Sequence, residues 1–154
     1  MVVFQQSTKT NLETGSVLKK KNNATIFLLD DDLSVLKALN RLLKLAGFNV
    51  KAYSSAHEFL NCGYEKQPGL LILDMRMPEM SGIEVQKIIV DSGSKMPIVF
   101  ITAHENEEIK KVAIEAGAVA FFQKPFEDNK LLSAISMGLE KATGEARHNR
   151  MNSK

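Results

Sequence analysis

The chain is poor in features that would place it in a membrane or in an oxidising compartment. One cysteine, Cys62, occurs among 154 residues, so no intramolecular disulfide forms and a reducing compartment is indicated. No apolar run approaches the roughly 20 residues that a membrane-spanning helix requires. Residues 1–21 also lack the apolar block of a secretory signal. We therefore expect a soluble, cytoplasmic protein.

Excess charge is also missing. The formal net charge is +2, which is too small to indicate nucleic acid as a partner. Thirty residues follow Lys124, too few to complete the last helix of the domain and also build a helix-turn-helix output unit. We expect no direct binding to DNA.

The composition indicates one folded domain. Hydrophobic residues make up 44% and charged residues 25% of the chain, a composition typical of one ordinary globular domain.

Several common catalytic motifs are absent. There is no Gly-x-x-x-x-Gly-Lys-Ser/Thr loop, no Gly-x-Gly-x-x-Gly fingerprint and no Gly-x-Ser-x-Gly elbow. His57, His104 and His148 are scattered without the spacing of metal ligands. These absences argue against a nucleotide-binding loop of the usual kinds, a serine hydrolase and a zinc site.

The middle of the chain alternates short apolar runs with helical patterns. We predict a flexible extension over residues 1–23, a folded domain over 24–141 and a mobile tail over 142–154. The predicted strands cover 24–29, 48–53, 70–73, 97–101 and 118–123, and the predicted helices cover 33–46, 55–61, 82–90, 105–116 and 126–141. Leu33 and Ile88 fall on the expected apolar faces of the first and third of these helices. Such alternation with short connections indicates an α/β fold with a mostly parallel sheet covered on both faces.

Polar side chains stand where the predicted strands end. The first strand is followed by Asp30, Asp31 and Asp32, and the third strand closes on Asp74. In an open parallel sheet, ligands bind outside the carboxyl ends of the strands. Thr102 and Lys124 follow the fourth and fifth strands, so all these groups are expected at one edge of the sheet.

Each of these residues also has a plain structural explanation. Asp32 can cap the first helix and Thr102 the fourth, while Lys124 can be a solvated lysine. The set as a whole is harder to explain in this way, because carboxylates crowded together repel one another unless a proton or cation intervenes. Carboxylates, a carbonyl and water suit Mg²⁺. A carboxylate nucleophile, a metal, a hydroxyl and an ammonium group are the parts for phosphoryl transfer onto an aspartate.

Four separated motifs make the chain resemble a known family. Leu29–Asp32, Leu71–Gly82, Ile98–Ala103 and Gln123–Phe126 resemble the matching segments of response-regulator receiver domains of two-component systems, most closely the nitrogen-fixation FixJ type. The resemblance covers about residues 24–141. It implies a flavodoxin-like (βα)5 doubly wound fold, with a parallel five-stranded sheet in the order 2-1-3-4-5.

The resemblance also implies a metal site. Asp74 would accept the phosphoryl group. Asp31 and Asp74 would ligate Mg²⁺ directly, together with the backbone carbonyl of Arg76, and Asp30 would hold the metal through water. From their positions two residues beyond Asp74 and Thr102, we also expect Arg76 and His104 to stand at the rim of the pocket and to tune the lifetime of the phosphorylated form.

Three further residues would take part in the switch. Thr102 would hydrogen-bond the phosphoryl group, and Lys124 would pair with it after first pairing with Asp74. Phe121 occupies the place of an aromatic switch residue, although a plain core role for it stays open. A cis peptide bond is expected before Pro125.

The implied partners are proteins. A sensor histidine kinase or a phosphotransfer protein would donate the phosphoryl group near the first helix. A downstream partner, or a second copy of the chain, would bind the face made by the fourth helix, the fifth strand and the fifth helix. Ile109, Val112 and the exposed side of Leu131–Leu139 are candidates for that surface.

Two other functions stay open at this point. An Mg²⁺-dependent phosphatase with an aspartyl nucleophile would usually carry a second acid two residues after the nucleophile, where this chain has Arg76. A receiver-fold interaction module that is never phosphorylated is the other alternative. We expect a phospho-acceptor switch that acts on itself rather than an enzyme that turns over external substrates.

Overall fold

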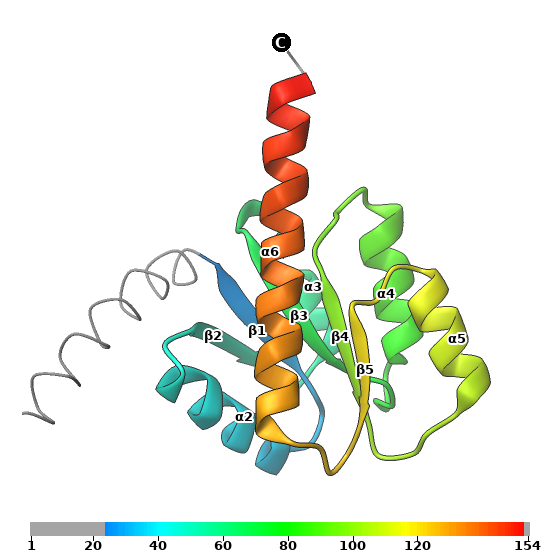
Figure 1. Ribbon diagram of the computed structural model, residues 1–154. Coiled ribbons are helices and arrows are strands. Elements are labelled where there is room, and N and C mark those ends of the chain that lie inside the picture. Colours follow the sequence, from blue (N-terminus) through cyan, green and yellow to red (C-terminus); the bar gives the residue numbers. More distant parts are fainter. Residues whose placement is uncertain (1–23, 153–154) are drawn as a thin grey trace, which may run out of the picture.

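Five parallel strands form one sheet in a computed structural model that describes residues 24–152. The order β2-β1-β3-β4-β5 confirms the predicted fold (Figure 1). The strands are β1 (Thr25–Leu29), β2 (Asn49–Tyr53), β3 (Gly69–Asp74), β4 (Ile98–Thr102) and β5 (Ala120–Gln123). The predicted extension over residues 1–23 lies outside the described residues.

Helices cover both faces of the sheet (Figure 1). The helices are α2 (Leu33–Leu45), α3 (Ala56–Leu60), the 3-10 helix η1 (Tyr64–Lys66), α4 (Gly82–Asp91), α5 (Glu107–Glu115) and α6 (Asp128–Asn152). None of the helices within residues 24–152 has the length and apolar character that a bilayer crossing requires.

The strands build two separate cores because their side chains alternate between the two faces. Phe27 and Leu29 of β1 pack toward α3, α4 and α5, whereas Ile26 and Leu28 pack toward α2 and α6. All five residues of β1 are buried, as expected for a central strand of a sheet that is covered on both sides.

Side chains at the helix starts explain several of the predicted boundaries. Asp32 caps α2 by accepting hydrogen bonds from the backbone N–H groups of Ser34 and Val35. Ser55 caps α3 through the N–H of Glu58. For α5 the capping residue is Asn106, so Thr102 does not have the capping role that was one explanation for it.

Two expectations from the sequence are wrong, and one short element was not predicted. Leu33 is 69% exposed and Ile88 is 40% exposed, so neither is a core residue. The last helix does not end at Lys141 but continues to Asn152. The 3-10 turn over Tyr64–Lys66 was not foreseen, because a single turn is too short to produce a periodic pattern.

The two helices that flank β5 are anchored differently. Helix α6 buries Leu131, Ala134 and Ile135 against the sheet, and Gly138 lets it approach closely, since a Cβ there would lie 2.8 Å from Leu70 Cδ1. Among the nine residues of α5, only Ala113 is buried. Helix α5 therefore has much less apolar contact holding it in place.

Candidate functional site

Three carboxylates meet at the carboxyl ends of β1 and β3. One oxygen from each of Asp30, Asp31 and Asp74 lies within 4.8 Å of the others. Asp30 and Asp74 are 1% and 5% exposed, whereas Asp31 is exposed. The register of the sheet explains this meeting, because Leu29 lies opposite Leu73 in the parallel β1–β3 pair and the residues after them emerge together.

Asp30 is held in place by its backbone and by its side chain. Its N–H donates to the carbonyl oxygen of Tyr53 at 3.2 Å, and its Oδ1 accepts from the N–H of Asp32 at 2.9 Å. Asp32 itself points to the helix start and caps α2. Of the three successive aspartates, the first two therefore face the site, and the third has the structural role.

Lys124 joins the site from the end of β5. Its Nζ lies 2.9 Å from Asp30 Oδ2 and 3.5 Å from Asp74 Oδ1. The expected contact with Asp74 is present, but the closer partner is Asp30, which sequence reasoning missed. Nothing in the local sequence indicates this contact, because 94 residues separate the two side chains. The Lys124–Pro125 bond is cis, as predicted.

The surroundings of Asp74 make its carboxyl group unusually hard to ionise. Burial, followed by the nearby charge of Asp30, raises its pKa from 3.8 to about 7. Lys124 opposes this rise, and Asp31 adds to it through a hydrogen bond and through its charge. The Asp74 carboxyl group is therefore only partly ionised near neutral pH. A cation bound in the cluster would favour its ionised form.

Lys124 is stabilised in its charged form. Burial alone would lower the pKa of its ammonium group, but the hydrogen bonds and charges of Asp30 and Asp74 outweigh that effect and raise the pKa. A permanent positive charge therefore stands beside the Asp74 carboxylate. The carboxylate oxygens suit a hard metal ion. The fixed positive charge of Lys124 suits an incoming anionic group.

Thr102 is 1% exposed at the end of β4. Its hydroxyl donates to the carbonyl oxygen of His104 at 2.9 Å and accepts from the His104 N–H at 3.3 Å. The hydroxyl thus ties together the loop that leads into α5. Its predicted contact with a phosphoryl group stays a prediction.

Phe121 can now be distinguished from its neighbour Phe122. Phe121 is half-buried and its ring is tilted against Phe100, with 5.9 Å between the ring centroids. Phe122 points to the opposite face and meets Phe126 at 5.8 Å. Strand alternation therefore puts Phe121 on the face of α3, α4 and α5, and its switch role stays a prediction.

Two predicted rim residues are exposed, as their proposed roles require. Both Arg76 and His104 are exposed, at the loops that follow β3 and β4. That the Arg76 carbonyl is a metal ligand stays a prediction. Gly82 lies against the backbone of the same loop: a Cβ there would lie 2.6 Å from the carbonyl oxygen of Asp74, which explains why a glycine starts α4.

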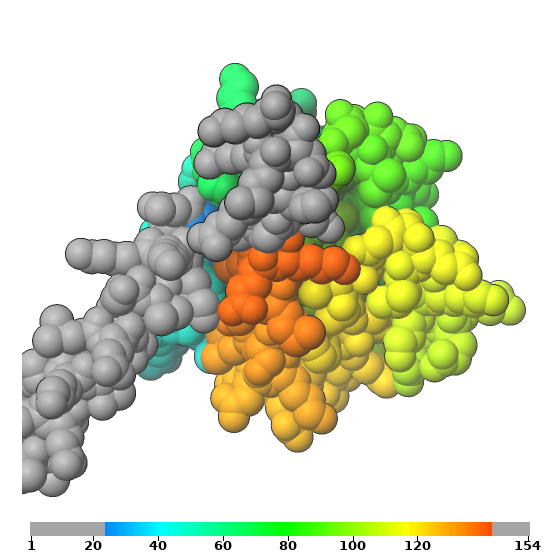
Figure 2. Space-filling model, turned by 45° about the horizontal axis from the view of Figure 1, so that its top comes forward, coloured from blue at the N-terminus to red at the C-terminus, as the bar shows by residue number. Residues whose placement is uncertain are grey.

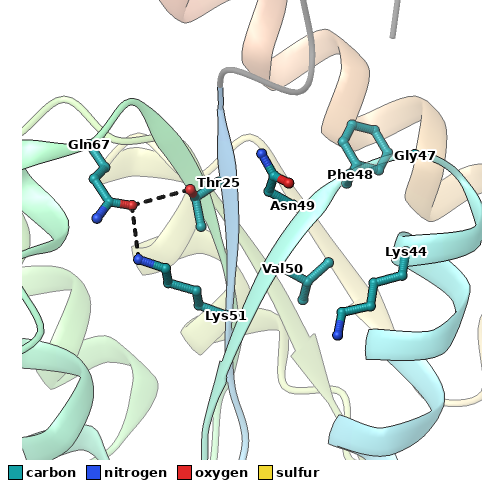
Figure 3. Close-up of a pocket in the computed structure, with 8 residues that line it drawn as sticks. All are labelled: Thr25, Lys44, Gly47, Phe48, Asn49, Val50, Lys51 and Gln67. Carbon is teal, nitrogen blue, oxygen red and sulfur yellow. Dashed lines mark hydrogen bonds between the residues drawn. The ribbon is translucent and has the colours of Figure 1, made fainter. Parts of the chain in front are cut away.

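A hollow of about 590 Å³ lies at the opposite edge of the sheet, where β1 and β2 begin (Figure 3). Its lining includes Thr25, Lys44, Lys51 and Gln67. The Gln67 side-chain oxygen accepts from Thr25 Oγ1 at 3.2 Å and from Lys51 Nζ at 3.3 Å. No carboxylate lines this hollow, so it differs from the acidic cluster at the other edge.

Comparison with known proteins identifies relatives that match most of the chain. The family model for the response regulator receiver domain matches residues 26–136. The response regulator protein TodT of Pseudomonas putida is 44% identical over 130 residues, which cover 84% of this chain and 57% of that regulator. The transcriptional regulatory protein FixJ of Rhizobium meliloti is 38% identical over 116 residues, which cover 75% of this chain and 57% of FixJ. The chain therefore spans little more than half the length of these relatives.

Solved structures agree with the sequence comparisons. The response regulator StyR superimposes with a TM-score of 0.77 at 44% identity, covering 85% of this chain and 66% of StyR. The structure named FixJ-N gives a TM-score of 0.71 at 38% identity, covering 76% of this chain and 94% of that one. With the acidic cluster and the sheet order, these matches show that the chain belongs to the response regulator receiver domain family of two-component systems.

Proposed function

We propose that this chain is a phosphorylation switch, which accepts a phosphoryl group on Asp74 in an Mg²⁺-dependent reaction. The observation that carries the proposal is the buried Asp74 carboxylate, which clusters with Asp30 and Asp31 and lies 3.5 Å from the Lys124 ammonium group. A purely structural cluster would not require two buried carboxylates that repel each other at the open end of the sheet.

In the proposed reaction, a carboxylate oxygen of Asp74 forms a bond to phosphorus while the bond from phosphorus to the donor atom breaks. The donor atom is a histidine nitrogen in a kinase or phosphotransfer protein, and it leaves with the bonding electron pair. Asp74 must be ionised to attack, and Lys124 favours that form. Lys124 then balances charge on the transferred oxygens.

The side chains present fit a magnesium ion. Asp30, Asp31 and Asp74 offer hard oxygen atoms in one cluster, and no thiolate or imidazole ligand competes there within the described residues. When bound, Mg²⁺ would offset the repulsion among the carboxylates and draw negative charge from the phosphoryl oxygens.

Phosphorylation of Asp74 would change the positions of Thr102 and Phe121. It adds up to about two negative charges and three acceptor oxygens. The Thr102 hydroxyl would leave the His104 carbonyl and donate to one of these oxygens, and Phe121 would move into the space that opens. The face formed by α5, β5 and α6, where Val112 is 50% exposed, would then bind a downstream protein or a second copy.

Two residues beside the site bear on how long the phosphoryl group would persist and on whether the chain would act on other substrates. Arg76 and His104, both exposed at the rim, would admit or exclude the hydrolytic water. Arg76 also stands where a phosphatase would carry its second acid, so the chain would modify itself without turning over external substrates.

The proposed compartment is the bacterial cytoplasm. The relatives are bacterial regulators, and a cysteine without a disulfide, Cys62, suits that compartment.

Intact-mass measurement after incubation with Mg²⁺ and acetyl phosphate tests the proposal, with Asp74→Asn as the matched control. We expect one labile phosphoryl adduct on the wild type, none on Asp74→Asn, and none when a chelator is added. Absence of an adduct over a range of donors and times would favour a receiver-fold module that works without phosphorylation. Release of phosphate from small phosphomonoesters would instead indicate a phosphatase.

A further inference from the structure

A buried glutamine connects α4 to α5. Gln86 is 2% exposed, and its side-chain Nε2 donates to the backbone carbonyl oxygen of Ala113 at 3.0 Å. The two helices lie side by side at the edge of the molecule (Figure 2). A polar side chain buried this deeply is costly unless its hydrogen bond is made, so the bond fixes where α5 sits.

The Ala113 carbonyl is a junction in the backbone as well. It also accepts the N–H of Ala118, which lies in the connection from α5 to β5. One oxygen atom therefore joins α4, α5 and the chain leading to Phe121 and Lys124. Ala113 is also the one buried residue of α5, so the hydrogen bond reinforces the single point at which this weakly packed helix is buried.

The opposite end of α5 is connected to the site by Thr102. The Thr102 hydroxyl holds the loop before α5 through the His104 carbonyl. If Thr102 is drawn toward Asp74, this loop is released, and α5 is free to move unless something else holds it. The Gln86 bond is directional, so a shift of α5 by a fraction of a turn would break it.

We propose that Gln86 is a positioning residue that latches α5 in the arrangement of the unphosphorylated chain and so opposes the switch. The proposal rests on the function proposed above for Asp74. The latch would lower the fraction of molecules in the switched arrangement, and removing it would raise that fraction.

Gln86→Met tests the latch, because methionine has a similar length and volume but cannot donate a hydrogen bond. Gln86→Leu is a second variant, should one side chain pack poorly. Gln67→Met is the control: the exposed Gln67 also makes side-chain hydrogen bonds, but as an acceptor, and they join it to β1 and β2 rather than to α5 (Figure 3). The first measurement is hydrogen exchange of residues 107–115 without phosphodonor, in the wild-type and Asp74→Asn backgrounds.

We expect exchange in α5 to rise about fivefold in both backgrounds, as for loss of one net hydrogen bond, with no change in Gln67→Met. If hydrogen exchange in α5 is unchanged in Gln86→Met, the latch proposal is wrong. This result does not depend on whether Asp74 is ever phosphorylated. The second measurement is the rate of phosphorylation by acetyl phosphate, expected to rise about two- to fivefold in Gln86→Met. Faster exchange with an unchanged or slower phosphorylation rate would show that the bond only fastens α5 and does not oppose the switch.

Discussion

The two edges of the sheet use lysine in opposite ways. At the carboxyl edge, the Lys124 side chain is 22% exposed and lies against two buried carboxylates. At the amino edge, the exposed Lys51 donates to an uncharged side chain, that of Gln67 (Figure 3). The same residue type is thus part of a buried charge network at one edge and a solvated surface group at the other.

The comparison teaches where charge is costly in this fold. Burial of the Asp74 carboxyl group, followed by the charge of the buried Asp30 beside it, raises the pKa of Asp74 to about 7, and the single Lys124 offsets this only in part. The amino edge carries no such cost, because its charges face water. Substitutions at the two edges should therefore differ sharply in their effects on stability.

The largest effect is expected from Lys124→Met. Removing the ammonium group leaves Asp30 and Asp74 buried without their cation, which should lower the free energy of unfolding by about 2–4 kcal/mol near pH 8 without metal. Urea denaturation in the presence of a chelator measures this loss. A loss below about 0.5 kcal/mol would place Lys124 with the solvated lysines of the other edge.

Asp74→Asn should stabilise the metal-free protein at alkaline pH. Because the pKa of Asp74 is raised in the folded state, its contribution to stability is fully present below its unfolded pKa of 3.8 and is lost as the pH rises through about 7. Asparagine does not titrate, so the variant should gain about 1–3 kcal/mol over the wild type near pH 8 and almost nothing near pH 4.

The pH series itself provides the control for Asp74→Asn. Urea denaturation of both proteins at several pH values, with chelator, should show the difference growing between pH 4 and pH 8. Adding Mg²⁺ near pH 8 should narrow it, because a bound cation stabilises the wild type only. A difference that is constant with pH would mean that Asp74 is not the titrating group.

Gly82→Ala tests how tightly the carboxyl edge is built. The added Cβ would approach the carbonyl oxygen of Asp74 to 2.6 Å, and this neighbour is backbone that moves with difficulty. We expect a loss of about 1–2 kcal/mol in urea denaturation, together with slower phosphorylation of Asp74. Phosphorylation at the wild-type rate would show that the loop after Asp74 tolerates a shift.

The smallest effect is expected from Lys51→Met at the amino edge. Its partner Gln67 is neutral and the pair is exposed, so the free energy of unfolding should change by less than about 0.5 kcal/mol at any pH. The same denaturation series that serves Lys124→Met measures it. An effect as large as that of Lys124→Met would remove the contrast between the two edges.

Much of this architecture was predictable because it depends on short-range patterns. The buried run before Asp30, the Asp32 cap and the alternation of strands and helices all follow from neighbouring residues. The exposure of single side chains and the ends of helices were less predictable. Leu33 and Ile88 fit an apolar period but face solvent. Helix α6 passes Lys141 although the composition there turns polar, because a polar stretch does not by itself end a helix.

By itself, the sequence determined the fold class, the strand ends that carry Asp74, Thr102 and Lys124, and the family. Tertiary structure alone decided which of these groups touch. It placed Lys124 closer to Asp30 than to Asp74, and it brought Gln86 to the Ala113 carbonyl, 27 residues away along the chain. The physical reason is that local patterns specify elements, whereas a contact between side chains depends on strand register and helix packing, which the whole chain sets together.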